Sequence, residues 1–199
     1  MRRAAFIDKD GTLIYDVPYN VNPARIRLRA GAAAALSELQ AAGYEIILVT
    51  NQPGVAIGRF SERALGAVWT CLSKRLAAQG VRLPGIYYCP HHPQAVDPRY
   101  RKQCHCRKPR AGLLLNAARG HDVDLTRSWM VGDILDDVEA AHRAGCRAIL
   151  LDAGSETEWR LSSLRIPDFV APNFASVSSH ILANRARNPV RHELNGSRH

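Results

Sequence analysis

Short apolar runs alternate along the chain with longer segments whose apolar residues recur at helical spacing. Each short run predicts a buried strand, at residues 4–8, 45–50, 85–89, 129–132, 147–151 and 169–170. The longer segments predict helices at residues 30–42, 61–76, 110–119, 135–144 and 173–184. We expect Gly43 to end the first helix and Asn173 to cap the last. This alternation predicts an α/β protein with a doubly wound parallel sheet and helices on both faces.

The candidate site follows from this sheet, because ligands bind beyond the carboxyl ends of parallel strands. Asp8 and Asp10 come directly after the first predicted strand, and Asp133 follows the fourth. Carboxylates that converge repel each other, so we expect a cation between them, and oxygen ligands without sulfur favour Mg²⁺. A surface turn at Asp10-Gly11 is the alternative, since this pair is common in turns.

Two further polar residues lie at the same predicted edge. Thr50 ends the second predicted strand with a hydroxyl, and Lys108 places a cation shortly before the third predicted helix. A carboxylate nucleophile, a second carboxylate, phosphate-binding donors and a metal together suit phosphoryl transfer through an aspartyl-phosphate.

The five cysteines do not suggest a disulfide framework, because their number is odd and no export signal precedes them. Three of them and one histidine form a set that predicts a tetrahedral, structural zinc site in the loop 89–107: Cys89, His91, Cys104 and Cys106. His92 and His105 are rival imidazole ligands, and a group of unliganded thiols is the alternative. We expect Cys71 and Cys146 to be small apolar core residues.

Composition and charge exclude some functional classes. The 199 residues are 46% hydrophobic and 23% charged, as in globular proteins, and no apolar run predicts a membrane span. Part of the formal net charge of +9 lies at residues 185–199, where we expect a disordered basic tail after a single domain at 1–184. We expect a cytoplasmic monomer that binds neither a membrane nor nucleic acid.

The order of the motifs resembles the haloacid dehalogenase (HAD) superfamily of phosphatases. The resemblance covers about residues 6–151 and rests on Asp8-Lys-Asp10-Gly-Thr12, Thr50-Asn-Gln, Lys108 and Gly132-Asp133 with Asp137. It implies a Rossmann-like core in which Asp8 is the nucleophile. Asp10 would protonate the leaving oxygen and then activate water, while Thr50 and Lys108 would hold the phosphoryl group.

The same resemblance implies a magnesium site. Its ligands would be the side chains of Asp8 and Asp133 and the backbone carbonyl of Asp10. Asp137 would orient Lys108 or a metal-bound water. The spacing between motifs leaves no room for a large cap domain, so we expect a capless enzyme with the zinc loop beside the active site.

Within the superfamily, the zinc loop and Thr50-Asn-Gln-x-Gly are similar to the D-glycero-D-manno-heptose 1,7-bisphosphate 7-phosphatase group. This implies a sugar phosphate that loses its C7 phosphate. The substrate contacts would come from Asp16, Tyr19, Thr50, Asn51, Gln52, Arg107 and Lys108. Two positions depart from the group, with Pro53 where a serine is usual and Ile134 where a lysine is frequent. We expect Arg107 to bind the second phosphate of the substrate, at C1. The alternative is that Arg107 balances the negative charge of the zinc cluster.

Three other functions remain open. A histidinol-phosphate phosphatase shares the motifs and the zinc loop, so relative turnover of the two substrates separates them. A nucleic-acid 3′-phosphatase fits the basic chain, but no basic platform with interleaved aromatic residues is visible. A non-enzymatic zinc scaffold predicts a decayed catalytic set, whereas all its members are present: Asp8, Asp10, Thr50, Lys108 and Asp133.

Overall fold

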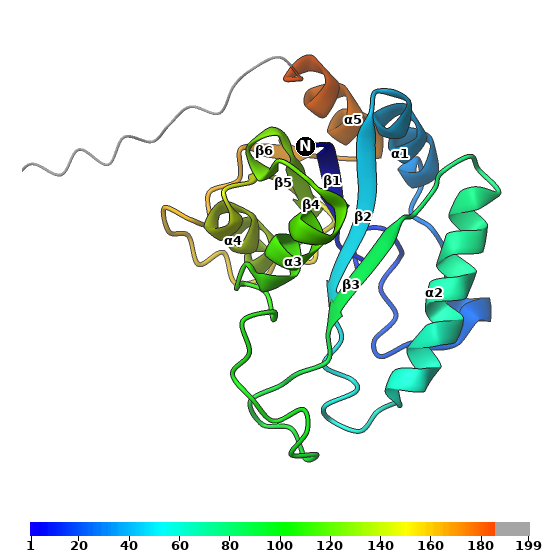
Figure 1. Ribbon diagram of the computed structural model, residues 1–199, viewed down its shortest axis with the longest axis vertical. Helices are drawn as coiled ribbons and strands as arrows, with labels where there is room; N and C mark the ends of the chain where they lie inside the picture. The colour runs from blue at the N-terminus through cyan, green and yellow to red at the C-terminus, as the bar shows by residue number, and fades with distance from the viewer. Residues whose placement is uncertain (186–199) are drawn as a thin grey trace, which may run out of the picture.

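Six parallel strands form one sheet in the order β3-β2-β1-β4-β5-β6 in the computed structural model, which describes residues 1–185 (Figure 1). The strands are β1 (Arg3–Ile7), β2 (Tyr44–Asn51), β3 (Gly85–Cys89), β4 (Trp129–Gly132), β5 (Arg147–Leu151) and β6 (Phe169–Ala171). The chain winds from β1 to β3 in one direction and continues with β4 on the other side of β1. The predicted doubly wound parallel sheet is therefore confirmed, and its switch point lies between β1 and β4.

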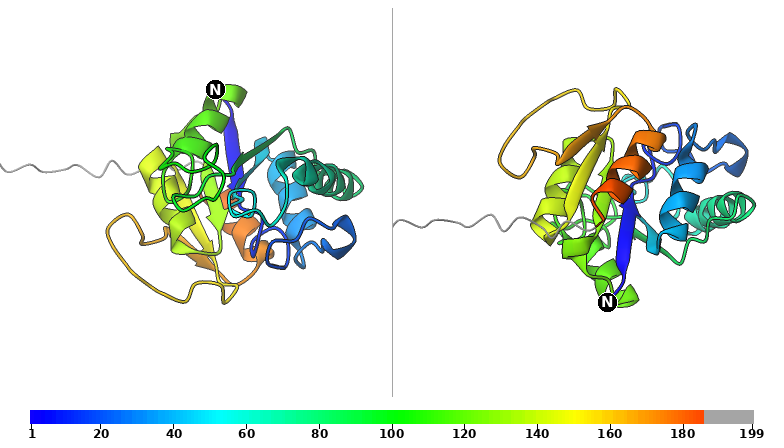
Figure 2. Two further views of the ribbon diagram at one scale, coloured as in Figure 1. Left: turned by 90° about the horizontal axis from the view of Figure 1, so that it is seen from below. Right: turned by 90° about the horizontal axis from the view of Figure 1, so that it is seen from above.

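Helices cover both faces of this sheet (Figure 2). One face carries α1 (Ala32–Ala41), α2 (Glu62–Ala77) and α5 (Phe174–Ala183), and the other carries α3 (Gly112–His121) and α4 (Leu135–Ala144). Side chains alternate along a strand, so β2 directs Leu48 into the first core and Val49 into the second. Both faces are buried, which explains why the strands are apolar throughout.

Local signals set most of the element boundaries. The side chains of Ser61 and Asn173 cap α2 and α5, and Gly43 follows α1 with a φ of 88°. The strands β3, β4 and β5 and the helix α4 occupy the predicted residues. Two 3₁₀ turns, Pro23–Arg25 and Leu125–Arg127, were not predicted, because three residues carry no periodicity.

Some expectations need correction. The first and third helices begin two residues later than predicted, and the third continues to His121. Cys146 is buried as expected, but Cys71 is only half-buried on α2. Its sulfur accepts a hydrogen bond at 3.2 Å from Arg75, one turn further along the same helix, and lies 3.7 Å from the Pro23 carbonyl, so Cys71 is at the polar edge of the core.

Residues 1–185 contain no cap domain, as the motif spacing predicts. The predicted tail falls outside the described residues from position 186 onward. Within the described part, no helix is long and apolar enough to cross a bilayer.

After β5, residues 152–168 form a long segment without helix or strand. Side-chain contacts hold this segment against α4. Arg165 contacts the carboxylates of Asp136 and Glu139. His142 lies between two acceptors, with Nδ1 2.9 Å from the Leu164 carbonyl and Nε2 3.0 Å from Asp168 Oδ2. Neither acceptor can donate, so the two bonds together require the imidazolium form of His142.

The charge on His142 predicts a pH-dependent stability. The hydrogen bond that His142 donates to Asp168 raises the pKa of His142, and burial opposes this shift. A raised folded-state pKa means that the stabilisation is complete below the unfolded pKa and is lost as pH rises through the folded value. We expect His142→Gln to lower the free energy of unfolding by up to about 1 kcal/mol near pH 5.5 and by less near pH 8.5. Urea denaturation at both pH values measures this, and an equal loss at both would contradict it.

Candidate active site and cysteine loop

The predicted motif residues meet at the carboxyl edge of three adjacent strands. Asp8 follows β1, Thr50 lies near the end of β2, and Asp133 follows β4. The Asp8 N–H donates to the Val131 carbonyl at 2.9 Å, which fixes this junction of β1 and β4. A cavity of about 280 Å³ opens here, lined by Asp8, Asp10, Asp16, Thr50, Asn51, Lys108, Asp133, Ile134, Asp137 and Ser155.

Lys108 is the central cation of this cavity, and it is almost fully buried. Its Nζ lies 2.5 Å from Asp8 Oδ1 and 2.5 Å from Asp137 Oδ1, and it also donates to the Val49 carbonyl at 3.3 Å. Burial opposes the charged form, but Asp137 and Asp8 more than compensate and raise the pKa of Lys108. Lys108 therefore stays charged and faces the cavity.

The acidic residues around Lys108 fit a divalent cation. Carboxylate oxygens of Asp8, Asp133 and Asp137 all lie within 4.8 Å of one another, and all three residues are buried. Burial raises the pKa of Asp8, and although Lys108 opposes the shift, the neighbouring carboxylates add to it. One ammonium does not balance three carboxylates, so the donor set suits Mg²⁺.

Two unpredicted contacts shape this acidic group. The Thr12 hydroxyl donates to Asp133 Oδ1 at 2.8 Å and orients that carboxylate. At the N-terminus of α4, Ile134 provides no side-chain cap, and the Leu135 N–H donates instead to Glu156 Oε2 at 2.7 Å. Glu156 comes from the segment after β5, and no local sequence signal links it to this helix.

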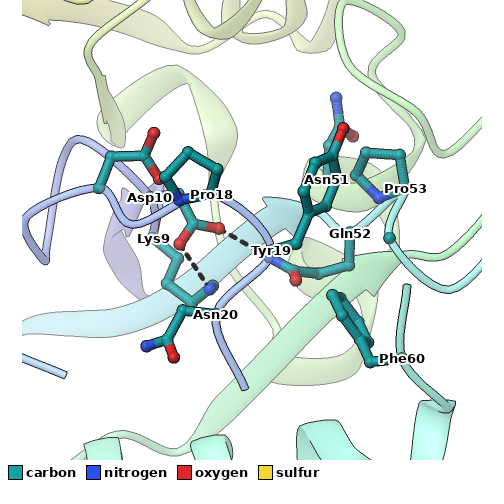
Figure 3. A pocket seen from close by; sticks show the side chains of 11 residues that line it. Lys9, Asp10, Pro18, Tyr19, Asn20, Asn51, Gln52, Pro53 and Phe60 are labelled. Atoms are coloured by element: carbon teal, nitrogen blue, oxygen red, sulfur yellow. Dashed lines mark hydrogen bonds and ion pairs between the residues drawn. The ribbon is translucent and has the colours of Figure 1, made fainter. Parts of the chain in front are cut away.

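Asp10 is held from two sides at the rim of the cavity (Figure 3). Lys9 Nζ donates to one carboxylate oxygen at 2.6 Å, and Gln52 Nε2 donates to the other at 2.9 Å. Lys9 was not predicted as a site residue, because adjacent side chains usually point to opposite sides of an extended segment.

Asn51 was predicted to contact substrate, yet its amide is engaged by the backbone of Lys108. Its Nδ2 donates to the Lys108 carbonyl at 3.1 Å, and its Oδ1 accepts from the Lys108 N–H at 3.0 Å. This pair of bonds ties the end of β2 to the peptide that carries the buried ammonium. Asn51 can thus position Lys108 while it also lines the cavity.

The remaining predicted substrate residues line two cavities that adjoin the acidic one. Asp16, Tyr19 and Gln52 line a cavity of about 270 Å³, with Pro53 in the same wall (Figure 3). Arg107 lines a larger cavity of about 600 Å³, which shares Lys108 with the acidic cavity. This larger cavity is basic, and its charged lining residues are Lys102, Arg107, Lys108, Arg110, Asp136 and Arg143. The Arg107 Nη1 atom is buried there without a hydrogen-bond partner.

The four predicted zinc ligands come together in the cysteine loop. The Cys89 sulfur lies 3.4 Å from that of Cys104 and 3.1 Å from that of Cys106, and His91 Nδ1 lies 3.3 Å from the Cys106 sulfur. A zinc tetrahedron with bonds of about 2.3 Å has edges of about 3.8 Å, so small shifts would accommodate the ion. The cysteines are unpaired by disulfides, which leaves their sulfurs free to bind a metal.

The structure also distinguishes His91 from its two rivals. The His92 ring accepts a hydrogen bond from the Gln94 N–H at 3.1 Å, and His105 is exposed. Neither belongs to the group of four potential ligands that lie within 4.8 Å of one another. The loop is joined to the active site because the Gln52 N–H donates to the Cys89 carbonyl at 2.8 Å.

The loop and the strand that leads into it are also fixed to α2 through Glu62. Its carboxylate accepts hydrogen bonds from the Tyr88 and Tyr100 hydroxyls at 2.8 and 2.9 Å. Burial and the bond to Glu62 raise the pKa of Tyr88 to about 12, so the phenol remains a donor at neutral pH.

Known proteins resemble this chain in sequence and in fold. A family model described as HAD-hydrolase-like matches residues 105–177. A D-glycero-beta-D-manno-heptose-1,7-bisphosphate 7-phosphatase from Photorhabdus laumondii is 44% identical over 138 residues, which are 69% of this chain and 73% of that protein. The resemblance to HAD phosphatases that the motifs indicated is therefore confirmed.

Two crystal structures share the fold. One is a HAD-like protein from Mesorhizobium loti, with a TM-score of 0.81 and 30% identity, which covers 96% of this chain and 89% of that one. The other is a D,D-heptose 1,7-bisphosphate phosphatase from B. bronchiseptica, complexed with magnesium and phosphate. It has a TM-score of 0.76 and 30% identity, and it covers 92% of this chain and 99% of that one.

The bonds from Asn51 to Lys108 predict a stability effect. Asn51→Leu leaves the N–H and the carbonyl of Lys108 without their hydrogen bonds to the Asn51 side chain. We therefore expect the free energy of unfolding to fall by about 2–4 kcal/mol. Urea denaturation measures this change. Asn116→Leu is the matched control, because Asn116 is exposed on α3, and it should change the value by less than about 0.5 kcal/mol. Equal losses in the two variants would show that the Asn51 bonds contribute little.

Proposed function

Because this chain belongs to the HAD-like phosphatase family, we propose that it removes the C7 phosphate of D-glycero-D-manno-heptose 1,7-bisphosphate through an aspartyl-phosphate on Asp8. The observation that carries the proposal is the buried arrangement of Asp8, Lys108 and Asp137 at the switch point of the sheet. It offers a carboxylate nucleophile next to a fixed cation in a cavity large enough for a phosphoryl group.

In the first step, an Asp8 carboxylate oxygen attacks phosphorus while the bond from phosphorus to the C7 oxygen breaks. The Asp10 carboxyl gives its proton to the departing oxygen, which leaves as the sugar hydroxyl. In the second step, a water oxygen attacks phosphorus and Asp10 takes up the water proton. The acyl-phosphate bond breaks, releasing inorganic phosphate and restoring Asp8.

Lys108 and Thr50 would hold the phosphoryl oxygens during both steps. The ammonium is already charged and fixed by Asp137, so little reorganisation is needed as negative charge shifts. Asp8, Asp133 and the Asp10 carbonyl would hold Mg²⁺, which neutralises the carboxylates and the phosphoryl oxygens when bound. Asp137 would serve mainly to orient Lys108, in agreement with their contact of 2.5 Å.

The distal C1 phosphate would be bound by Arg107. Its buried Nη1 lacks a hydrogen-bond partner, and it lines a basic cavity that shares Lys108 with the acidic one. A guanidinium binds phosphate oxygens as a fork, which suits this position. Asp16 and Tyr19 would contact the sugar from the opposite cavity.

The names of the relatives favour a heptose bisphosphate over histidinol phosphate. No specific observation favours a nucleic-acid 3′-phosphatase or a non-enzymatic scaffold.

The cysteine loop would hold one structural zinc ion through Cys89, His91, Cys104 and Cys106. All four ligands come from the protein, so no position would stay open for catalysis. The ion would fix the peptide that leads through Arg107 to Lys108. The Arg107 N–H already contacts the Cys104 sulfur at 3.4 Å, which supports this connection.

A substrate panel tests the function. We expect the enzyme with Mg²⁺ to hydrolyse the heptose 1,7-bisphosphate faster than histidinol phosphate, measured as kcat/KM from phosphate release. Arg107→Ala should lower kcat/KM for the bisphosphate by about 10–100-fold and change a heptose 7-monophosphate much less, because one charge-assisted contact is lost.

Asp8→Asn, purified in the same way, reports contaminating phosphatase and should lose at least about 10³-fold in kcat. Faster turnover of histidinol phosphate by the unmutated enzyme would reject the substrate. Equal losses for both heptose phosphates would leave Arg107 only a charge-balancing role.

Metal analysis tests the zinc site. We expect about one zinc ion per chain in protein purified with reductant and without chelator. Cys104→Ser should lose most of this zinc and lower kcat, while circular dichroism shows an intact sheet. Cys71→Ser is the control, because Cys71 lies on α2 outside the loop, and it should keep its zinc. Zinc-free unmutated protein would overturn the assignment.

A further inference from the structure

The Asp10 carboxylate has an unusual environment for a residue at the rim of a cavity. Both of its oxygens accept hydrogen bonds from donors that are themselves buried, Lys9 and Gln52, as the dashed lines in Figure 3 show. Asp10 is itself one-third exposed. The carboxylate plane is therefore fixed by the protein while its outer edge remains accessible to a substrate.

Lys9 is buried more completely than its chemistry favours. Only 2% of its surface is exposed, although an isolated buried ammonium is strongly unfavourable. Asp10 is its one ion-pair partner among residues 1–185, at 2.6 Å. Its Nζ also lies 5.9 Å from the centre of the Trp69 ring on α2, which forms a wall behind the ammonium. The pairing with Asp10 is thus what makes this burial tolerable.

Gln52 connects the same carboxylate to the phosphate-binding side of the site. Its Nε2 lies 2.9 Å from Asp10 Oδ2 and 3.1 Å from the Thr50 hydroxyl. The Gln52 backbone is fixed as well, because its N–H donates to the Cys89 carbonyl at 2.8 Å. Lys9 and Gln52 consequently hold Asp10 between two rigid parts of the fold.

We propose that Lys9 is a positioning residue that, with Gln52, fixes the Asp10 carboxyl in the orientation required for proton transfer to the leaving oxygen. The proposal rests on the proposed function, in which Asp10 exchanges that proton. Each carboxylate oxygen has two lone pairs, and the two protein donors use one on each. The other lone pairs remain for the proton that passes to the leaving oxygen or arrives from water.

A fixed Asp10 carboxyl would speed the reaction by keeping its proton within reach of the leaving oxygen. Proton transfer contributes about 10²–10⁴-fold only when donor and acceptor are within hydrogen-bond reach. A misplacement of about 1 Å can cost about 100-fold. A lysine that only balanced the charge of the carboxylates would instead affect every phosphate ester to the same degree. If Lys9 positions Asp10, its loss should slow esters with poor leaving groups most. If Lys9 only balances charge, its loss should slow all phosphate esters equally.

The experiment compares two substrates with Lys9→Met, which keeps the length of the side chain and removes its charge and donors. A heptose phosphate needs a proton on its departing alkoxide, whereas p-nitrophenyl phosphate releases a stable phenolate without one. The quantity measured is kcat/KM, because it reports the steps up to aspartyl-phosphate formation and excludes the later hydrolysis. Lys74→Met on α2 is the matched control, since Lys74 is exposed and lines none of the three cavities of the site.

We expect Lys9→Met to lower kcat/KM for the heptose phosphate by about 10–100-fold and to change it for p-nitrophenyl phosphate by less than about threefold. Lys74→Met should leave both values unchanged. Equal losses for the two substrates, or no loss, would overturn the proposal. If Lys9→Met fails to fold, Lys9→Gln retains a polar side chain, and the same comparison decides.

Asp10→Asn, measured in parallel, separates this proposal from the proposed function. It should show the same preference for the good leaving group, more strongly. If Asp10→Asn lacks that preference, the role of Asp10 in the proposed function fails. If Asp10→Asn shows the preference and Lys9→Met does not, only the positioning role of Lys9 fails.

Discussion

The buried ammonium of Lys108 constrains the rest of the active site. A charge in this position is tolerable only when its partners arrive with it, because an unpaired buried ion costs several kcal/mol. Its partners, Asp8 and Asp137, come from the end of β1 and the first turn of α4. The end of β1, the first turn of α4 and the peptide of Lys108 are far apart in the chain, so all three must be in place before the buried charges are paired. The doubly wound sheet provides this arrangement by placing β1 between β2 and β4.

The cysteine loop extends the same constraint to the least regular part of the fold. It carries the peptide of Lys108 and has no helix or strand of its own between β3 and α3. Its position is set at both ends, by Asn51 at Lys108 and by the Gln52 N–H at Cys89. A metal bound to the four ligand residues would fix the part between these ends. The position of the lysine would then be set by hydrogen bonds and metal ligation, and not by a helix or strand.

Charge is distributed unevenly around the site. The central cavity is acidic, while the adjoining cavity that shares Lys108 is basic. A cation and a phosphoryl group suit the first, and a second anion suits the other. The proposed bisphosphate substrate fits this division of charge between the two cavities. Asp10 lies between the acidic cavity and the cavity lined by Tyr19. The buried donors Lys9 and Gln52 fix the orientation of its carboxylate there.

The sequence by itself determined the strands, the parallel sheet, the motif residues at the strand ends and the three cysteines of the candidate zinc site, because these depend on local apolar patterns and on residue types at short spacing. Tertiary structure alone decided that His91 and neither of its rivals joins the cysteines, that Asn51 binds the Lys108 peptide, and that Lys9 turns back to Asp10. Each of these outcomes depends on packing between segments far apart in the chain. Glu156 capping α4 from the segment after β5 is the clearest case, since no periodicity encodes a contact made only after the sheet has formed.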